Sequence, residues 1–239
     1  MTRVLIVDDH RTTLARGLAA VLELPCDIYT CKHEVEAGIN SDWTAAFVDF
    51  DLNSPTETGL SIMEFLFDRC PEVRRIVHTS LSENGRTLFA LAACAWFDAE
   101  VILDKECSET QICQAVNLLE NPTPRRWLER RRRAADIIDD LLQPGWLPLW
   151  QIWPEVNGSV KAAKARLGKH QPDPRTFAKE ALAILEKHRD MFGLASLNPV
   201  AGRAYSSYAV PLTVFAEANS KFFGAPDLAA VLASQSMRY

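Results

Sequence analysis

In the first half of the chain, short runs of apolar residues alternate with segments in which apolar residues recur every three or four positions. The runs predict strands buried on both faces, and the spaced segments predict amphipathic helices. The predicted strands are Arg3–Val7, Asp27–Cys31, Ala45–Asp49, Arg75–Thr79 and Val101–Leu103. The predicted helices are Thr12–Leu24, Leu60–Cys70, Arg86–Ala95 and Ser108–Leu119. This alternation predicts an α/β fold, a doubly wound parallel sheet of about five strands.

The pattern changes at Asn121-Pro122-Thr123-Pro124, where two prolines interrupt it, and we place a domain boundary there. The apolar residues that follow have the spacing of an amphipathic helix: Ala134, Ile137, Ile138, Leu141 and Leu142. Pro144-Gly145 ends this helix, and no strand-like series follows it in the sequence. We therefore predict a domain of residues 1–120, a linker helix in residues 121–145 and a mostly α-helical C-terminal domain of residues 146–239.

Two helices are predicted in the first half of the C-terminal domain. Ser159 is a suitable N-cap for a short helix that ends at Gly168, and Asp173-Pro174 has the residue types of an N-cap and first turn. Further helical patterns cover Leu212–Phe223 and Asp227–Ser234. The last segments are rich in aromatic residues, and they either complete the core of this domain or form a surface for a partner.

Charge divides the chain at the same boundary. Residues 1–120 contain 9 Lys and Arg against 20 Asp and Glu, a net charge of −11, whereas residues 121–239 contain 17 against 11, a net charge of +6. A basic second half favours a polyanionic partner. The six cysteines lie in the first half without CxxC spacing, which favours reduced core thiols over a zinc site. With no apolar run of membrane-spanning length and no signal-like N-terminus, we expect a cytoplasmic protein with no membrane segment.

Chemically active residues follow four of the predicted strands. They are Asp8 and Asp9 after the first strand, Asp49 at the third, Thr79 at the fourth and Lys105 after the fifth. Because the carboxyl ends of parallel strands meet at one edge of a sheet, we expect these side chains to converge. Adjacent carboxylates repel each other unless a cation is present, and Mg²⁺ prefers such ligands. One carboxylate can then attack phosphorus to form an aspartyl phosphate. The alternative is a loop whose acids are simply solvated.

Residues 3–119 resemble the receiver domain of two-component response regulators. Four segments carry the resemblance: VLIVDDH, FVDFDLNSPTETGLSIMEFL, RIVHTS and VILDKECSE. They are similar, in order, to the acidic-pair motif, the phosphoacceptor strand with its loop and helix, the threonine strand and the lysine strand. The functional positions occur in the order and at the strand ends that the family requires.

The resemblance implies a role for each of these residues. The implied phosphoacceptor is Asp49. The implied Mg²⁺ ligands are Asp8, Asp9, Asp49 and the main-chain carbonyl of Asp51. The implied phosphoryl-sensing switch is Thr79, the implied counter-charge is Lys105, and the implied phosphoryl donor is a sensor histidine kinase. We expect Asp49 rather than Asp51 to be the acceptor, because the apolar strand runs directly into Asp49.

Two positions depart from the family pattern. Asn53 stands where a proline is usual, and Ile102 stands where an aromatic residue is common three positions before the lysine. The usual coupling between the threonine and an aromatic side chain is therefore not expected. A receiver-like fold that has lost phosphorylation remains an alternative interpretation.

Basic residues gather at two places in the second half. The first group lies in the predicted linker helix and includes Arg130, Arg131, Arg132 and Arg133. The second group decorates the predicted helix pair and comprises Lys161, Lys164, Arg166, Lys169, Arg175 and Lys179. The pair resembles a helix-turn-helix, whose second helix enters the major groove of double-stranded DNA. The arginines would add phosphate contacts whose strength depends on salt. An ordinary helical hairpin with solvated basic faces is the alternative.

Together these patterns predict a response regulator that is phosphorylated on Asp49 with Mg²⁺ and controls transcription through a DNA-binding helical domain. The amphipathic linker helix makes a homodimer plausible. We find no nucleophile elbow, metal-ligand cluster or Gly-rich phosphate loop in the second half, so an enzymatic output is not expected. The alternative is a protein–protein adaptor, controlled by phosphorylation, whose helical output does not bind DNA.

Overall fold

The computed structural model describes residues 3–10, 14–39, 42–117, 125–169, 172–189 and 209–238. The chain forms two compact units. The first combines Met1–Ala135 with Ala225–Tyr239, and the second is Asp136–Gly224. The boundaries of these compact units differ from those of the expected domains, residues 1–120, 121–145 and 146–239. Compact units are not the same as functional domains, so the expected domains stay a prediction.

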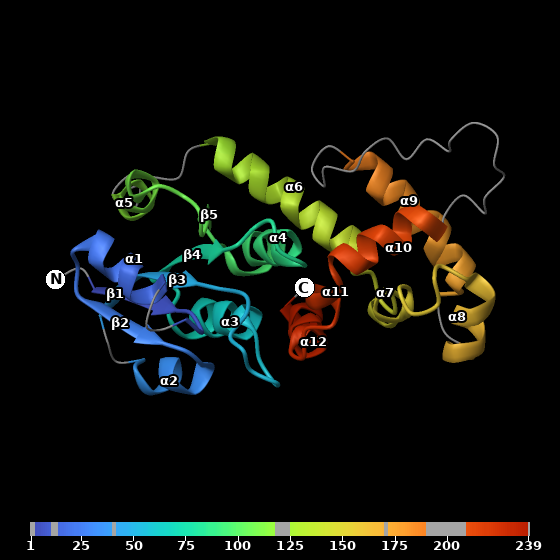
Figure 1. The fold of residues 1–239 in the computed structure, drawn as a ribbon, viewed down its shortest axis with the longest axis horizontal. Helices are drawn as coiled ribbons and strands as arrows, with labels where there is room; N and C mark the ends of the chain where they lie inside the picture. The colour runs from blue at the N-terminus through green and yellow to red at the C-terminus, as the bar shows by residue number, and fades with distance from the viewer. Residues whose placement is uncertain are drawn as a thin grey trace. The chain divides into compact units, whose positions relative to one another are not determined.

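The first unit contains a five-stranded parallel sheet with the strand order β2-β1-β3-β4-β5 (Figure 1). Its strands are β1 (Arg3–Val7), β2 (Cys26–Tyr29), β3 (Trp43–Val48), β4 (Arg74–Thr79) and β5 (Val101–Asp104). β1 lies between β2 and β3, so the strand order reverses at β1. Such a reversal is the usual place for a ligand crevice in an open parallel sheet. The predicted doubly wound parallel sheet is confirmed, with each strand within two residues of its expected bounds.

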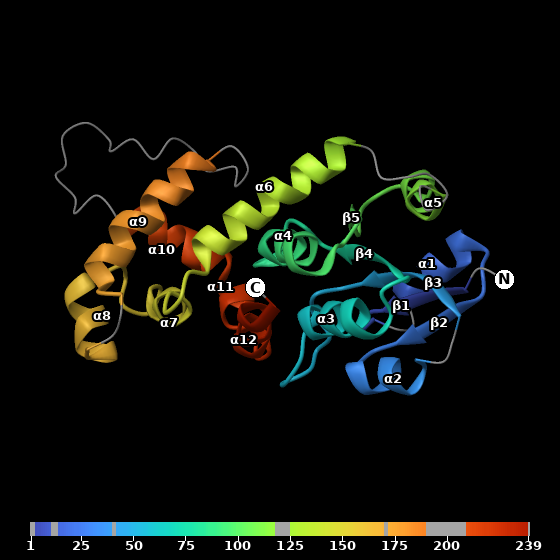
Figure 2. The ribbon, with the colours of Figure 1, turned by 180° about the vertical axis from the view of Figure 1, so that it is seen from behind.

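Helices cover both faces of this sheet. They are α1 (Leu14–Leu22), α2 (Lys32–Ala37), α3 (Gly59–Arg69), α4 (Arg86–Phe97) and α5 (Glu109–Asn117). One face carries α1 and α5, whose side chains share a buried cluster with Val4, Ile6 and Phe47. The other face carries α2, α3 and α4 (Figure 2). Successive strand residues point to opposite faces, which explains why the central strands β1 and β3 are buried and largely apolar on both faces.

The local signals of this unit mostly agree with the structure. Ser108 and Gln111 form the expected reciprocal cap of α5, in which the Ser108 backbone N–H donates to Gln111 Oε1 at 2.9 Å. The expected helices differ from α1, α3, α4 and α5 mainly at their ends, and their residues Thr12 and Leu119 lie outside the described part of the chain. The short helix α2 was not predicted, because Val35 is its only buried residue and gives no apolar spacing.

The second unit is helical and contains the tryptophan-rich segment. Its helices are the end of α6 (Arg125–Leu141), α7 (Leu147–Ile152), α8 (Val160–Leu167), α9 (Pro174–Lys187), α10 (Ala209–Ala218) and α11 (Ser220–Phe223). Trp146, Trp150 and Trp153 are buried and pack around Phe177. Trp150 also stacks on Phe223 with ring centroids 4.9 Å apart. From the aromatic-rich last stretch, Phe215, Phe222 and Phe223 are buried in this unit and belong to its core, whereas Tyr205 and Tyr208 lie outside the described residues.

The predicted caps in the second unit are confirmed. The Ser159 hydroxyl accepts from the Ala162 backbone N–H at 3.2 Å at the start of α8, and Gly168 follows α8 with a positive φ of 63°. The Asp173 carboxylate accepts from the Arg175 backbone N–H at 2.9 Å at the start of α9. The helix pair expected from the sequence is therefore present.

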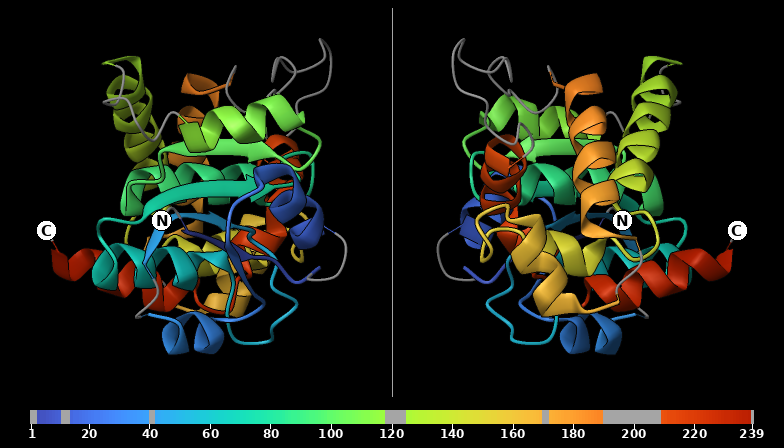
Figure 3. Two further views of the ribbon diagram at one scale, coloured as in Figure 1. Left: turned by 90° about the vertical axis from the view of Figure 1, so that its left-hand side faces the viewer. Right: turned by 90° about the vertical axis from the view of Figure 1, so that its right-hand side faces the viewer.

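The last helix, α12 (Leu228–Arg238), belongs to the first unit and packs against α3 (Figure 3). Leu228 and Val231 are buried. Asp227, just before this helix, accepts from the Thr58 backbone N–H at 2.7 Å and from the Ser61 backbone N–H at 3.3 Å. The C-terminal residues thus complete the end of α3 that lies next to Asp49.

None of the helices in the described ranges combines the length and the apolar character needed to cross a bilayer.

Candidate functional site

A pocket of about 160 Å³ lies at the carboxyl end of the sheet. Its lining comes from the ends of β1, β3 and β5 and from the segment after β4, and comprises Asp9, His10, Asp49, Asp51, Ser80, Glu83, Arg86 and Lys105. The parallel ladder continues one residue beyond β1 and β3, since the Asp8 N–H donates to the Tyr29 carbonyl and the Asp49 N–H donates to the Val7 carbonyl. Asp8 and Asp49 are therefore held by the sheet itself.

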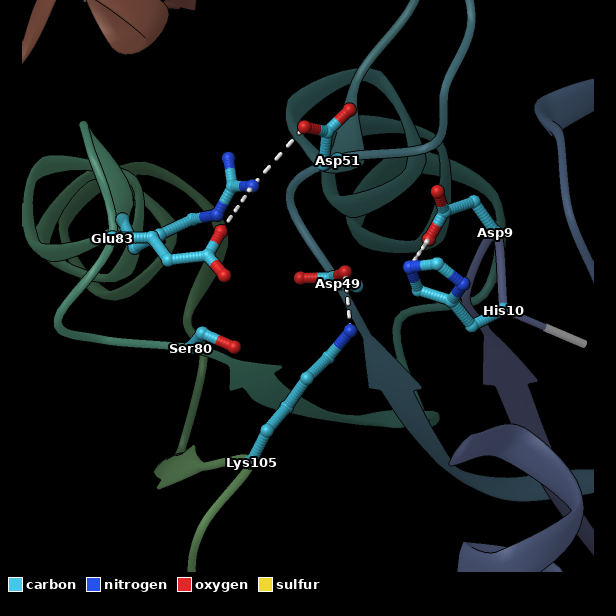
Figure 4. Close-up of a pocket in the computed structure, with 8 residues that line it drawn as sticks. Asp9, His10, Asp49, Asp51, Ser80, Glu83 and Lys105 are labelled. Carbon is cyan, nitrogen blue, oxygen red and sulfur yellow. Dashed lines mark hydrogen bonds and ion pairs between the residues drawn. The ribbon is translucent and has the colours of Figure 1, made fainter. Parts of the chain in front are cut away.

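Lys105 is the central cation of the pocket. Its Nζ lies 2.7 Å from Asp49 Oδ2 and 2.9 Å from Asp8 Oδ2. Figure 4 shows its side chain reaching from the end of β5 to Asp49, with Asp9 and His10 to one side and Glu83 to the other (Figure 4). Burial lowers the pKa of Lys105, but the charge of Asp49 and hydrogen bonds to Asp49 and Asp8 outweigh this and raise it. The ammonium group therefore stays protonated at neutral pH.

The three carboxylates fit a small divalent cation. Oxygen atoms of Asp8, Asp9 and Asp49 lie within 4.8 Å of one another. Asp8 and Asp49 are buried, and burial together with their charges raises the pKa of Asp9, although His10 partly offsets this. Such an arrangement of hard oxygen donors under mutual repulsion suits Mg²⁺ or Ca²⁺. No side-chain carboxylate beyond these three is needed, because both ions keep water ligands or take main-chain carbonyls.

The Thr79 hydroxyl is buried at the end of β4 without a hydrogen-bond partner among the described residues. Leaving such a group unsatisfied costs about 1–3 kcal/mol. Thr79 is not among the residues that line the pocket, although it directly precedes Ser80, which is.

Asp51 lies on the pocket wall with its carboxylate already engaged. Its Oδ2 is 3.1 Å from Arg86 Nη2, and its Oδ1 accepts from the Asn53 backbone N–H at 3.3 Å. Asp49 is engaged as well, since its Oδ2 lies 2.7 Å from Lys105 Nζ and its Oδ1 accepts from the Phe50 N–H at 2.7 Å. It differs from Asp51 in being buried, whereas 40% of the Asp51 side chain is exposed, and in contacting the lysine of the pocket. Both differences agree with the expectation that Asp49 rather than Asp51 is the acceptor.

Gly59 allows the closest approach in the site. A side-chain Cβ at this first residue of α3 would lie 2.1 Å from the main-chain oxygen of Asp49, which no real contact permits. The Gly59 N–H also donates to the Phe50 carbonyl at 2.8 Å. The start of α3 is therefore packed directly on the backbone that presents Asp49.

Sequence reasoning missed four pocket residues: His10, Ser80, Glu83 and Arg86. Three of them come from residues 80–86, the segment after β4 together with the first residue of α4, where Gly85 adopts a left-handed conformation with φ of 78°. His10 and Ser80 could have been predicted as pocket residues, since each directly follows a candidate site residue in the sequence. Arg86 could not, because its place depends on the length and turn of that segment.

The basic residues of the second half are placed only in part. Lys161, Lys164, Arg166, Lys169, Arg175 and Lys179 are all exposed on or beside α8 and α9. Lys164 pairs with Asp173 at 2.6 Å, and Arg166 pairs with Glu155. Arg133 is exposed on α6. The side chains of Arg130, Arg131 and Arg132 lie outside the described part of the structure.

The fold is similar to that of solved response regulators. RcsB of Salmonella enterica serovar Typhimurium, bound to a promoter in the presence of a phosphomimetic, has 17% identity and a TM-score of 0.56 and covers 91% of this chain and 98% of its own. A structure of two RcsB dimers bound to two parallel DNAs has 18% identity and a TM-score of 0.54 and covers 90% and 97%. A CheY-like receiver domain of Methanospirillum hungatei has 21% identity and a TM-score of 0.42 and covers 56% and 98%.

No protein-family model matches the sequence, and no curated protein is similar enough to count as a relative. At these identities the RcsB structures establish the fold. The chain has the fold of a full-length response regulator, a receiver fold followed by a helical C-terminal part.

Proposed function

We propose that the protein is a response regulator of a two-component phosphorelay, which accepts a phosphoryl group on Asp49 and controls transcription by binding double-stranded DNA. One observation carries this proposal: Lys105 lies within 3 Å of both Asp49 and Asp8 in a pocket where Asp9 completes a carboxylate trio. A buried ammonium group between buried carboxylates is costly for stability alone. It is useful where negative charge arrives during a reaction.

In the proposed reaction, a carboxylate oxygen of Asp49 attacks the phosphorus of a phosphohistidine on a sensor kinase. The bond from phosphorus to the histidine nitrogen breaks, and an aspartyl phosphate forms. Lys105 remains protonated and offsets the charge of the phosphoryl oxygens. The Thr79 hydroxyl donates its hydrogen bond to one of these oxygens. The reaction needs positioning and charge neutralisation rather than a catalytic base.

Asp8, Asp9, Asp49 and the main-chain carbonyl of Asp51 are the residues proposed to hold Mg²⁺. The bound ion would neutralise charge on the carboxylates and on the phosphoryl oxygens. The oxygen spacing and the raised pKa of Asp9 support the three side-chain ligands.

Asp9→Asn is expected to weaken Mg²⁺ binding by about tenfold or more, since even outer partners of metal ligands contribute that much. Isothermal titration of the full-length chain with MgCl₂ measures the affinity. Glu72→Gln is the matched control, because Glu72 is an exposed acid before β4, at the other edge of the sheet. Equal Mg²⁺ affinity in Asp9→Asn and wild type would contradict the proposed site.

The output proposal rests on the helical second unit. Its exposed basic residues lie on or beside α8 and α9, which form a capped helix pair. The RcsB proteins of similar fold were solved on DNA, one of them as dimers, which supports double-stranded DNA as the partner and a homodimer as the binding form. Phosphorylation would then shift an equilibrium between conformations that differ in DNA affinity.

The DNA proposal predicts salt-dependent retardation of genomic DNA fragments by the full-length chain, strengthened by beryllofluoride with Mg²⁺. Replacing Lys161, Lys169 and Lys179 with Ala is expected to reduce the slope of log affinity against log salt by up to about 3, one for each lost phosphate contact. Lys187→Ala is the control, since Lys187 is on the same helix as Lys179 but pairs with Asp140 at 3.3 Å. An unchanged slope in the triple variant would contradict binding by these residues.

A protein–protein adaptor is the second candidate function. The pairs Lys164–Asp173 and Arg166–Glu155 favour it, because two of the six basic side chains are partly neutralised within the unit. If the chain binds beryllofluoride but retards no DNA at low salt, the receiver proposal stands and the output acts on a protein partner.

A further inference from the structure

Arg86, the first residue of α4, has an unusual environment for an arginine. Only 4% of its side chain is exposed, and its guanidinium carbon lies 4.8 Å from the centroid of the Phe50 ring. Its Nη2 contacts Asp51 at 3.1 Å and Glu83 at 3.2 Å. Its Nη1 is buried and has no hydrogen-bond partner among the described residues. The guanidinium is therefore buried but incompletely satisfied.

The two acids do not account for this burial. The side chains of Asp51 and Glu83 are 40% and 56% exposed, so their pairs with Arg86 are screened by solvent and weak. Burying a charge is costly unless its hydrogen bonds are complete, and a guanidinium has five N–H donors. One of its terminal nitrogens serves both acids while the other has no acceptor. An incoming group with several acceptor oxygens would complete the set.

Arg86 faces the same pocket in which such a group would arise on Asp49. Arg86 and Asp49 line the same cavity, together with Lys105 and Ser80. Lys105 is already shared between Asp8 and Asp49. A phosphoryl group on Asp49 brings further negatively charged oxygens, and a guanidinium binds such oxygens with a planar pair of donors.

We propose that Arg86 is a second phosphoryl-binding residue of this pocket, which exchanges its contact with Glu83 for an oxygen of the phosphoryl group on Asp49. The inference rests on the proposed phosphorylation of Asp49. It gives the segment from Ser80 to Arg86 a role in binding, since this segment carries both the guanidinium and its competing acid. Glu83 then competes with the phosphoryl group, because its carboxylate must leave Arg86 when the phosphoryl group binds.

Titration of the full-length chain with beryllofluoride in the presence of Mg²⁺ tests this, with tryptophan fluorescence or calorimetry as the readout. Arg86→Met is expected to weaken binding about tenfold, the effect of losing one charge-assisted contact. Arg86→Lys is expected to lie between Arg86→Met and wild type, because the charge remains and the planar fork is lost. Glu83→Gln is expected to tighten binding about threefold, and this gain is expected to vanish when Met replaces Arg86.

Arg75→Met is the matched control. Arg75 is also a buried arginine over a phenylalanine ring, 5.5 Å from Phe67, but it lies at the start of β4 and donates to the Phe97 carbonyl at 2.6 Å. If Arg86 is merely structural, any loss of beryllofluoride affinity in Arg86→Met follows its loss of stability, as in Arg75→Met, and Glu83→Gln does not tighten binding. The opposite sign of Glu83→Gln, lost without Arg86, is a result that structural damage does not produce.

The outcomes separate this inference from the proposed function. If wild type fails to bind beryllofluoride, both are overturned. If wild type binds and Arg86→Met and Glu83→Gln bind equally well, the role of Arg86 is overturned while phosphorylation of Asp49 stands. If Arg86→Met does not fold, the beryllofluoride affinities of Arg86→Lys and Glu83→Gln provide the test. The inference is overturned if both variants bind beryllofluoride as tightly as wild type.

Discussion

Asp49→Asn is expected to abolish phosphoryl transfer from acetyl phosphate in the presence of Mg²⁺, whereas Asp51→Asn retains it. Asp49 Oδ2 lies 2.7 Å from Lys105 Nζ, and its Oδ1 accepts from the Phe50 N–H at 2.7 Å. A carboxylate oxygen in this place can attack phosphorus and release acetate. An asparagine amide in the same place is not a nucleophile and cannot form the mixed anhydride.

The measurement is the intact mass of the full-length chain after incubation with acetyl phosphate. Wild type and Asp51→Asn are expected to gain the mass of one phosphoryl group, which hydroxylamine removes, and Asp49→Asn is expected to gain none. Asp51→Asn is a demanding control, because Asp51 lines the same pocket and differs mainly in being held by Arg86. Equal labelling of wild type and Asp49→Asn would show that the acceptor is another residue. An unlabelled wild type would favour a receiver fold that has lost phosphorylation.

The sheet and the residues at its edge could be predicted from sequence because their determinants are local. An apolar run that stops at Asp49 is visible in the chain, and parallel topology then brings the strand ends together. Capping is equally local, so both ends of α8 and the start of α9 were predicted from Ser159, Gly168 and Asp173. These signals depend on neighbours a few residues away, which a single sequence contains.

Contacts between distant segments could not be predicted in the same way. Helical spacing identified an apolar face in Asp227–Ser234 but not the helix that covers it, since any apolar surface satisfies the same pattern. The structure packs this segment against α3, in the first unit. The place of Arg86 in the pocket could not be predicted for a related reason. Whether a charged residue after a loop points to solvent or into a pocket depends on the loop path, which here includes the left-handed Gly85.

Asp227→Ala is expected to lower the free energy of unfolding of the first unit by about 3 kcal/mol, from the loss of a buried charged acceptor that serves several donors. Asp227 accepts from the Thr58 N–H at 2.7 Å, from the Thr58 hydroxyl at 2.9 Å and from the Ser61 N–H at 3.3 Å. It therefore acts as the acidic member of a capping box for α3, although it lies 169 residues from Thr58 in the chain. Its negative charge also complements the N-terminus of the α3 dipole.

Hydrogen exchange of the α3 amides, together with denaturant unfolding of the full-length chain, measures this effect. Faster exchange is expected in the first turn of α3, because the alanine variant leaves the N–H groups of Thr58 and Ser61 without their acceptor. Glu109→Ala is the control, since Glu109 is an exposed acid in the first turn of α5 in the same unit, where loss of one charge costs well under 1 kcal/mol. Equal stability of the two variants would mean that Asp227 contributes no more than a surface charge.

The Asp227 cap lies next to Asp49, so its loss is expected to affect beryllofluoride binding as well as stability. Gly59, the residue after Thr58, is in contact with the main chain of Asp49, so we expect a loosened first turn of α3 to disturb the backbone of this proposed phosphoacceptor. Asp227→Ala is therefore expected to weaken beryllofluoride binding as well, while Glu109→Ala leaves it unchanged. Full beryllofluoride affinity in a destabilised Asp227→Ala variant would show that the C-terminal helix supports the fold of α3 without influencing Asp49.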